Sequence, residues 1–301
     1  MIKVCLKGDV VKEFPKGITA YDVAKEISMG LAKQACAVRI NGENKDLRTE
    51  LNCDCALEIL TFDDAYGKRT FRHTASHIMA QAVKRLFPKT QVTIGPAVDD
   101  GFYYDFDTEN SFTPDDLKKI EEEMKKIVKE DIKIERFTMT RDEAVKYFKE
   151  KNEPYKVELV EAIEDGEEIS FYSQGDFTDL CAGAHLMSTG AVKAFKLTSA
   201  TGAYWRGNSD NKMLCRVYGT AFPKASMLEE HLNMLEEAKK RDHNKLGREL
   251  ELFTTVDVIG QGLPIMLPKG AKIIQTLQRF VEDEEYKRGW QLTKTPYMAK
   301  R

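Results

Sequence analysis

The sequence has 301 residues, of which 42% are hydrophobic and 32% are charged, and its formal net charge at pH 7 is −3. This length predicts two or three domains with a sizeable core, and the slightly acidic balance excludes a generally basic, polyanion-binding chain. No apolar run approaches the roughly 20 residues that span a membrane, and the N-terminus has no signal-peptide pattern. The six cysteines lack the spacing of a disulfide scaffold, which indicates reduced thiols in the cytoplasm.

Residues 1–61 predict a small domain with the order β-β-α-β-β. Thr19 and Asp22 resemble a capping box for one helix that continues to Leu31. An Asn41-Gly42 turn follows the third strand. The predicted strands are Ile2–Leu6, Val10–Phe14, Cys36–Ile40 and Ala56–Leu60. This order is compatible with a ubiquitin-like roll.

Residues 62–68 are interpreted as a linker, and residues 69–222 mix helices with strands as an α+β domain. Thr113-Pro114 and Thr140, each followed by acidic residues, predict two helix starts. The charges of the first of these helices, such as Glu121–Glu123, are interpreted as a solvated face. The predicted strands are Glu168–Ser173, Val192–Leu197 and Lys212–Tyr218.

A charged helix from Ser226 to about Arg241 is interpreted as a connector. A new segment begins near Asp242, with a helix over residues 270–288 and an extended stretch that ends in Thr295-Pro296. A helix and a strand are too few for a domain, so we expect this segment to be the start of a larger one.

Two histidines one helical turn apart give the main functional signal. In a helix over residues 69–87, an apolar stripe would face the core, and His73 and His77 would project from the opposite face. Cys181 and His185 repeat the same spacing. Four of the eleven cysteine and histidine residues therefore fall into two matched pairs, which indicates one shared chemical site.

The four side chains permit more than one chemistry. Three imidazoles and a thiolate form a reasonable tetrahedral zinc set. Without a metal, a neutral imidazole can act as a general base on water while a second histidine or a lysine stabilises an oxyanion. A covalent role for the Cys181 thiol is a further alternative. Scattered surface polar residues are the interpretation that the matched spacing disfavours.

Two aromatic segments predict either nucleic-acid contacts or core packing. The strand that contains Tyr103 and Tyr104 is a base-stacking surface or an ordinary hairpin with core aromatics. Trp205 and Arg206 stand on a glycine-flanked loop, where exposed aromatic and cationic groups would stack bases and hold phosphates. The remaining cysteines are expected to pack as small apolar residues: Cys5, Cys36, Cys53, Cys55 and Cys215.

A series of motifs in fixed order resembles the threonyl-tRNA synthetase family. The motifs are His73–His77, Gly95-Pro96, Gly101–Asp105, Gly175–His185, Gly202–Gly207, Tyr218–Pro223, Asp242–Gly247, Leu267–Gly270 and Thr295-Pro296. The resemblance covers essentially the whole chain. It implies a β-grasp TGS domain at 1–61, an editing domain at 62–222, a linker helix at 223–241 and, at 242–301, the truncated start of a class II antiparallel-sheet aminoacylation domain.

The same resemblance implies two sets of site residues. The implied catalytic residues are His73, His77, Lys156, Cys181 and His185. Tyr104 and Asp179, with Trp205 and Arg206 of the loop, are the predicted substrate-binding residues. No metal is expected, because the threonyl family is regarded as editing without zinc, whereas related alanyl-type proteins hold zinc with such a set. Ala182 and Ala184 depart from the family's usual arginine and proline, which puts the loop's rigidity and one tRNA contact in question.

The implied function is the proofreading part of an enzyme that attaches threonine to tRNA(Thr) using ATP. Serine lacks one methyl group, and a lost contact discriminates by only about 1–3 kcal/mol, so a second site that hydrolyses seryl-tRNA(Thr) is needed. No cofactor is expected for this chain, because the family's ATP, magnesium and zinc sites would lie beyond Arg301. The expected partner is tRNA(Thr), with threonine and ATP for the full-length enzyme, a cytoplasmic homodimer without a membrane partner.

Two alternatives remain from the residues. One is a free-standing zinc-dependent trans-editing deacylase, which the TGS-like start and the class II-like end disfavour. The other is a non-catalytic RNA-binding protein, which leaves the paired histidines unexplained.

Overall fold

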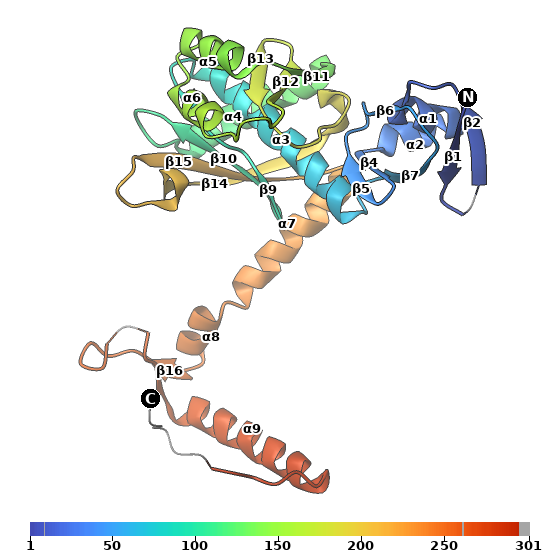
Figure 1. The fold of residues 1–301 in the computed structure, drawn as a ribbon. Coiled ribbons are helices and arrows are strands. Elements are labelled where there is room, and N and C mark those ends of the chain that lie inside the picture. Colours follow the sequence, from blue (N-terminus) through green and yellow to red (C-terminus); the bar gives the residue numbers. More distant parts are fainter. Residues whose placement is uncertain (9, 261, 295–301) are drawn as a thin grey trace. The chain divides into compact units, whose positions relative to one another are not determined.

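A computed structural model describes residues 1–8, 10–260 and 262–294 (Figure 1). Contacts divide the chain into two compact units, Met1–Glu229 and Glu230–Arg301. Among the described residues, no helix combines the length and the apolar character that a membrane crossing requires.

The first 61 residues, here called the N-terminal domain, fold as a mixed sheet around their own core. The strand order is β2-β1-β7-β4-β5, in which β1 and β7 are parallel and the other neighbours antiparallel. The strands are β1 (Ile2–Leu6), β2 (Val10–Phe14), β4 (Ala37–Ile40), β5 (Glu43–Lys45) and β7 (Cys55–Leu60), with a separate pair of β3 (Ile18–Thr19) and β6 (Glu50–Leu51). This topology agrees with the predicted ubiquitin-like roll.

Local signals set the helix and the hairpin of this domain. Thr19 caps α1 (Ala20–Ile27), and its hydroxyl oxygen accepts a hydrogen bond from the Asp22 amide at 3.1 Å. The predicted single helix to Leu31 is wrong, because Ser28 ends α1 and caps a second helix, α2 (Met29–Gln34). Asn41 and Gly42 have φ values of 50° and 88° in the turn between β4 and β5, as a two-residue hairpin requires.

The rest of the first unit is an α+β region built around one long helix, α3 (Ala65–Leu86) (Figure 1). One sheet has the order β14-β15-β10-β8 with β9 beside β10, and a second has the order β11-β12-β13. The strands are β8 (Gln91–Val92), β9 (Ala97–Val98), β10 (Gly101–Asp107), β11 (Ile134–Thr138), β12 (Ser170–Gln174), β13 (Phe177–Leu180), β14 (Ala194–Tyr204) and β15 (Met213–Phe222). The helices are α4 (Pro114–Glu130), α5 (Arg141–Glu150) and α6 (Pro154–Glu161), with 3-10 turns at Thr189–Ala191 and Trp205–Gly207.

Both faces of α3 are covered, which corrects the amphipathic interpretation. The apolar stripe faces the core, as predicted, and packs there against β10, β15 and α4. The opposite face meets β12 and β13, where Gln174 donates a hydrogen bond to the His77 carbonyl at 3.1 Å. His77 is therefore buried rather than directed at solvent. The helix also begins at Ala65, within the predicted linker.

Two further predictions, the solvated face of α4 and the extent of the strand over 192–197, differ from the structure. Thr113 and Thr140 do form the capping boxes of α4 and α5. On α4, however, Glu121 and Glu123 are buried, because Glu121 accepts bonds from Lys196 and the Leu197 amide of β14 at 2.9 and 2.7 Å. The strand predicted over 192–197 is much longer, since β14 continues through the expected loop to Tyr204.

The charged helix predicted from Ser226 to about Arg241 is present as α7 (Ala225–Lys240), and the boundary between the units falls within it. The second unit contains α8 (His243–Glu249), the strand pair β16 (Phe253–Thr254) and β17 (Ile265–Met266), and α9 (Pro268–Lys287). Its helix α9 agrees with the predicted helix over 270–288. Residues 290–294 form no strand, and the predicted Thr295-Pro296 motif lies outside the described residues.

Candidate functional site

The two predicted pairs of side chains meet in one place. His73 and His77 stand on α3, and Cys181 and His185 stand in the segment that follows β13. Their potential ligand atoms all lie within 4.8 Å of one another. The Cys181 sulfur is 3.2 Å from His185 Nε2 and 3.5 Å from His73 Nε2. The predicted convergence is therefore confirmed across about a hundred residues of sequence.

These four side chains border a pocket of 550 Å³. His73, His77 and Cys181 line it directly, whereas the fully buried His185 lies behind them. Its other described lining residues are Tyr66, Arg69, Thr70, Thr93, Ile94, Gly95, Pro96, Ala97, Lys156, Asp179, Leu180, Ala182, Gly183 and Ala184. A Cβ at Gly183 would lie 2.9 Å from the imidazole of His73, so a larger residue here would displace that ring. The part of the wall at residues 182–184 therefore consists of small residues, whereas the polar part consists of His73, His77, Lys156 and Asp179.

The partners of His185 define which of its nitrogens faces the cluster. The Thr74 hydroxyl donates its proton to the Thr70 carbonyl at 3.0 Å and accepts a bond from the Leu186 amide at 3.0 Å. It can therefore only accept from His185 Nδ1, which is 3.2 Å away. The proton of neutral His185 then resides on Nδ1, so the Nε2 lone pair points at the Cys181 sulfur.

A buried ionic network lies beside the histidines. The Asp179 carboxylate is 1% exposed, forms an ion pair with Lys156, and accepts a hydrogen bond from the Tyr104 hydroxyl at 2.6 Å. Its Oδ2 also lies 3.6 Å from His77 Nδ1, which orients that imidazole with Nε2 toward the cluster. Burial opposes the charge of Asp179, but Lys156, His77 and Tyr104 together hold its pKa below the ordinary value. Asp179 is thus a carboxylate that fixes three neighbours.

Burial keeps the cluster itself uncharged near neutral pH. It lowers the pKa of His73 to about 3 and of His77 to about 4, and that of His185 well below the ordinary value. Burial also raises the pKa of the Cys181 thiol to about 12. The imidazoles can therefore accept hydrogen bonds or bind a cation, whereas an un-ionised thiol is a weak nucleophile. This disfavours the covalent alternative for Cys181.

Two predicted substrate residues lie outside the pocket. Trp205 is 5% exposed, its indole N–H donates to Glu158 at 3.1 Å, and its ring packs 5.1 Å from Tyr155. Arg206 forms an ion pair with the same Glu158 at 3.1 Å. The prediction of an exposed, base-stacking Trp205 is wrong, because the tip of the β14–β15 hairpin folds onto α6. Both residues instead hold the helix that carries Lys156.

The structure also bears on the aromatic strand that contains Tyr104 and on the cysteines outside the pocket. Phe102, Tyr104 and Phe106 of β10 are fully buried, as the core alternative predicts, whereas Tyr103 is half-buried beside Arg216. Tyr104 joins the pocket network through its hydroxyl, which donates to Asp179, and its ring lies 6.2 Å from that of His77. Of the cysteines expected to pack as small apolar groups, Cys36 and Cys215 are buried, Cys5 and Cys55 are half-buried, and Cys53 is exposed. The packing expectation is therefore wrong for Cys53.

Sequence reasoning missed several residues of the site. Arg69 is exposed and lines the pocket, and the spacing of Arg69, His73 and His77 places all three on one face of α3. That regular spacing could have identified Arg69. Asp46 and Arg48 of the N-terminal domain also contact the segment around His185. No local pattern marks these two residues.

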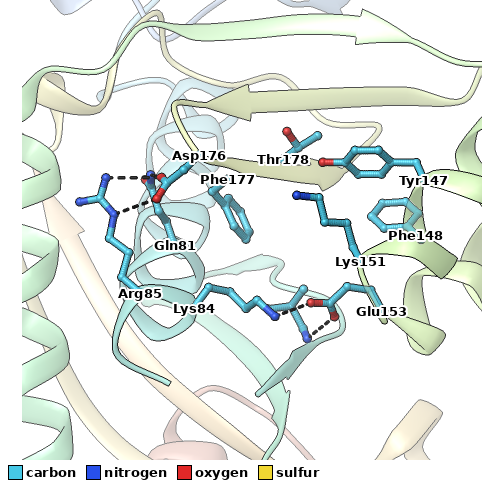
Figure 2. A pocket seen from close by; sticks show the side chains of 11 residues that line it. Gln81, Lys84, Arg85, Tyr147, Phe148, Lys151, Glu153, Asp176, Phe177 and Thr178 are labelled. Carbon is cyan, nitrogen blue, oxygen red and sulfur yellow. Dashed lines mark hydrogen bonds and ion pairs between the residues drawn. The ribbon is translucent and has the colours of Figure 1, made fainter. Parts of the chain in front are cut away.

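A second, smaller cavity, with a volume of 220 Å³, lies beside the end of α3. Figure 2 shows the side chains that line it. Its charges are largely paired, with Lys84 bound to Glu153 at 2.6 Å and Arg85 bound to Asp176 at 3.4 Å. Phe177 forms part of its wall. Among the described residues that line it, none is a histidine or a cysteine. The reactive groups predicted from the sequence thus belong to the larger pocket.

Two stretches of the chain match known domain families. Residues 2–61 match the TGS domain, and residues 169–218 match the threonyl and alanyl tRNA synthetase second additional domain. The first match coincides with the N-terminal domain. The second includes Asp179, Cys181 and His185.

The chain is also similar over its whole length to larger proteins. It is 59% identical over 300 residues to threonine–tRNA ligase of Clostridium perfringens strain SM101, which is 100% of this chain and 46% of that relative. It is 57% identical over 296 residues to threonine–tRNA ligase of Acetivibrio thermocellus, covering 98% of this chain and 46% of the relative. The chain spans about half the length of the curated relatives it matches. These findings confirm the resemblance that the motifs indicate.

Proposed function

We propose that this chain, which belongs to the threonyl-tRNA synthetase family, hydrolyses the ester bond of mischarged seryl-tRNA(Thr) in the pocket beside His73. The observation that carries the proposal is a neutral imidazole and a buried ammonium group on the wall of one pocket. Ester hydrolysis needs a group that orders water and a group that stabilises the oxyanion. His73 and Lys156 supply these two groups.

The reaction then proceeds by attack of water on the ester carbonyl. The water oxygen forms a bond to the carbonyl carbon, and the bond from that carbon to the ribose oxygen of the terminal adenosine breaks. The proton lost by water goes to the departing ribose oxygen, so serine and uncharged tRNA result. Because burial lowers the pKa of His73 to about 3, this imidazole does not remain protonated. A proton that it accepts from water must therefore move to the ribose oxygen within the same step. His73 acts as an orienting hydrogen-bond acceptor in a short relay.

The other polar groups hold this arrangement. Asp179 fixes the ammonium of Lys156 and the ring of His77. Cys181 and His185 shape the floor behind His73. The walls built from Gly95, Ala182 and Gly183 would accept the serine side chain and exclude one additional methyl group.

A second candidate is hydrolysis assisted by zinc, which the grouping of three histidines and a cysteine favours. A tetrahedral zinc shell has edges of about 3.3–3.8 Å, close to the two sulfur–nitrogen distances of 3.2 and 3.5 Å. The four residues therefore fit zinc after the widest separation of 4.8 Å contracts by roughly 1 Å. Bound zinc would supply a Lewis acid, but four protein ligands leave no position for water. We therefore retain the prediction of metal-free hydrolysis.

We also propose that this hydrolysis serves the attachment of threonine that the relatives' names describe. In that case tRNA(Thr) is the partner, threonine and ATP are substrates of the whole enzyme, and the reaction occurs in the cytoplasm. The metals and the homodimer expected for the full-length enzyme belong to the same proposal.

The test compares single-turnover hydrolysis of seryl- and threonyl-tRNA(Thr) by the purified chain. We expect rapid loss of serine and sparing of threonine. His73→Ala should lower the rate by about 10²–10⁴-fold with little change in tRNA affinity, because the group acts in the transition state. Lys125→Ala, on the exposed face of α4, is the matched control. Equal rates on both charged tRNAs, or an undiminished rate in His73→Ala, would refute the proposal.

A further inference from the structure

The main chain around His185 is bound by the N-terminal domain. Arg48 donates hydrogen bonds to the carbonyl oxygens of His185 and Leu186 at 3.1 and 2.8 Å, and to that of Ile134 at 3.1 Å. Asp46 accepts a bond from the His185 amide at 3.3 Å. Both backbone groups of His185 are therefore bound by side chains that lie about 140 residues earlier in the chain.

The same two residues also control what lies against the imidazole. The Tyr172 ring packs 4.4 Å from the ring of His185, and the Tyr172 hydroxyl donates to Asp46 at 2.9 Å. Arg48 Nη1 binds Asp46 at 3.0 Å, so the two charged side chains neutralise each other within the contact. We call Asp46, Arg48 and Tyr172 the interdomain clamp. It holds both the main chain and the ring of one member of the histidine–cysteine cluster.

The clamp stands on a rigid support. Leu47, between Asp46 and Arg48, is fully buried in the core of the N-terminal domain. Its carbonyl accepts a bond from the Tyr21 amide at 2.9 Å, which ties this loop to α1. Met187, two residues after His185, packs against the same core of the N-terminal domain. A rotation of the N-terminal domain would therefore move the His185 segment with it.

From these contacts we infer that Asp46 and Arg48 are positioning residues for the hydrolytic site. The inference rests on the proposed function and deepens it, because it makes the N-terminal domain part of the catalytic geometry in addition to any tRNA contact. The charged fork of Arg48 spans three carbonyl groups, which a lysine ammonium cannot reproduce. The His185 ring lies 4.5 Å from His73 and 4.3 Å from His77, so a displaced His185 shifts both.

The first test is kinetic and uses the whole chain. Arg48→Ala should lower the single-turnover rate on seryl-tRNA(Thr) at saturating enzyme by about 10- to 100-fold, as loss of an orienting partner does elsewhere. The enzyme concentration that gives half this rate should stay unchanged, because the clamp does not face the pocket. Arg39→Ala is the matched control, since Arg39 pairs with Glu58 at 2.8 Å within the N-terminal domain. It should leave both quantities unchanged.

Two milder variants cover the case in which Arg48→Ala fails to fold. Tyr172→Phe keeps the ring against His185 and removes only the bond to Asp46. Asp46→Asn keeps the size of the side chain, but its NH2 group then faces the backbone N–H of either His185 or Arg48. Two donors then face each other, and one hydrogen bond is lost. Both variants should slow hydrolysis without loss of affinity. A normal rate in these folded variants, or a loss of affinity alone in Arg48→Ala, would overturn the inference.

The second test needs no activity. Nitrogen NMR of labelled histidines should show altered ring signals for His185 in Arg48→Ala, while His231 and His243 of the second unit serve as internal controls. Unchanged His185 signals would overturn the positioning role. If the wild-type chain spares seryl-tRNA(Thr), the proposed function fails, and the NMR comparison alone decides whether the clamp positions His185.

Discussion

Replacing Asp179 by asparagine should destabilise the first unit strongly. The Asp179 carboxylate is 1% exposed, and its ion-pair partner Lys156 is 2% exposed. Asparagine preserves the size and can still accept the Tyr104 hydroxyl bond of 2.6 Å, but it leaves the ammonium of Lys156 buried without a counter-charge. Breaking one side of such a pair costs about 3–5 kcal/mol. The unfolding equilibrium constant should therefore rise by roughly two to four orders of magnitude.

Tryptophan fluorescence can follow this unit selectively. The chain has two tryptophans. Trp205 is buried against α6, which carries Lys156, whereas Trp290 is exposed in the second unit. In a Trp290→Phe background, urea unfolding monitored through Trp205 reports the free energy of the region around the pocket.

Two comparisons make the assay decisive. Asp165→Asn removes a fully exposed carboxylate, whose partner Arg141 is half-buried, and should leave the unfolding midpoint nearly unchanged. Adding Lys156→Met to Asp179→Asn should restore part of the lost stability, because the unpaired buried charge is then gone. A loss below about 1 kcal/mol, typical of an exposed pair, would refute the reasoning, as would a further loss on adding Lys156→Met.

Three other predictions concern protons, tRNA and metal. The pKa values of His73 and His77 are about 3 and about 4 in the folded state, against an ordinary 6.5. The unfolded chain therefore binds protons first, so the contribution of these residues to stability is fully present above pH 6.5 and is lost as the pH falls toward 4. A melting temperature that does not change over this pH range would contradict the prediction. Arg69→Ala should weaken tRNA binding and lower its logarithmic salt slope by about 1 without changing the rate at saturating enzyme, and an unchanged slope would remove Arg69 from the tRNA contact. Treatment with a chelator should leave hydrolysis unchanged; about one zinc per chain, with activity lost on its removal, would establish the metal alternative instead.

Local sequence determined much of this protein, because certain structures are decided within a few residues. The caps at Thr113 and Thr140, and the Asn41-Gly42 turn, were predictable since each satisfies backbone groups or dihedral angles of its own segment. The two four-residue spacings likewise identified His73 with His77, and Cys181 with His185, as pairs. The prediction that both imidazoles project from the face opposite the stripe also holds, since both line the pocket, but it did not foresee that His77 is buried there.

Only the tertiary structure decided which polar groups are buried and what they meet. The apolar stripe of α3 predicted which face meets the core, but periodicity says nothing of a second sheet that covers the polar face and buries His77. Glu121 was misread for the same reason, because its partners come from β14. Arg48 reaches His185 across 137 residues through backbone carbonyls, which carry no side-chain signal. A hydrogen bond to a distant main chain depends on the fold, and the sequence near either residue cannot encode it.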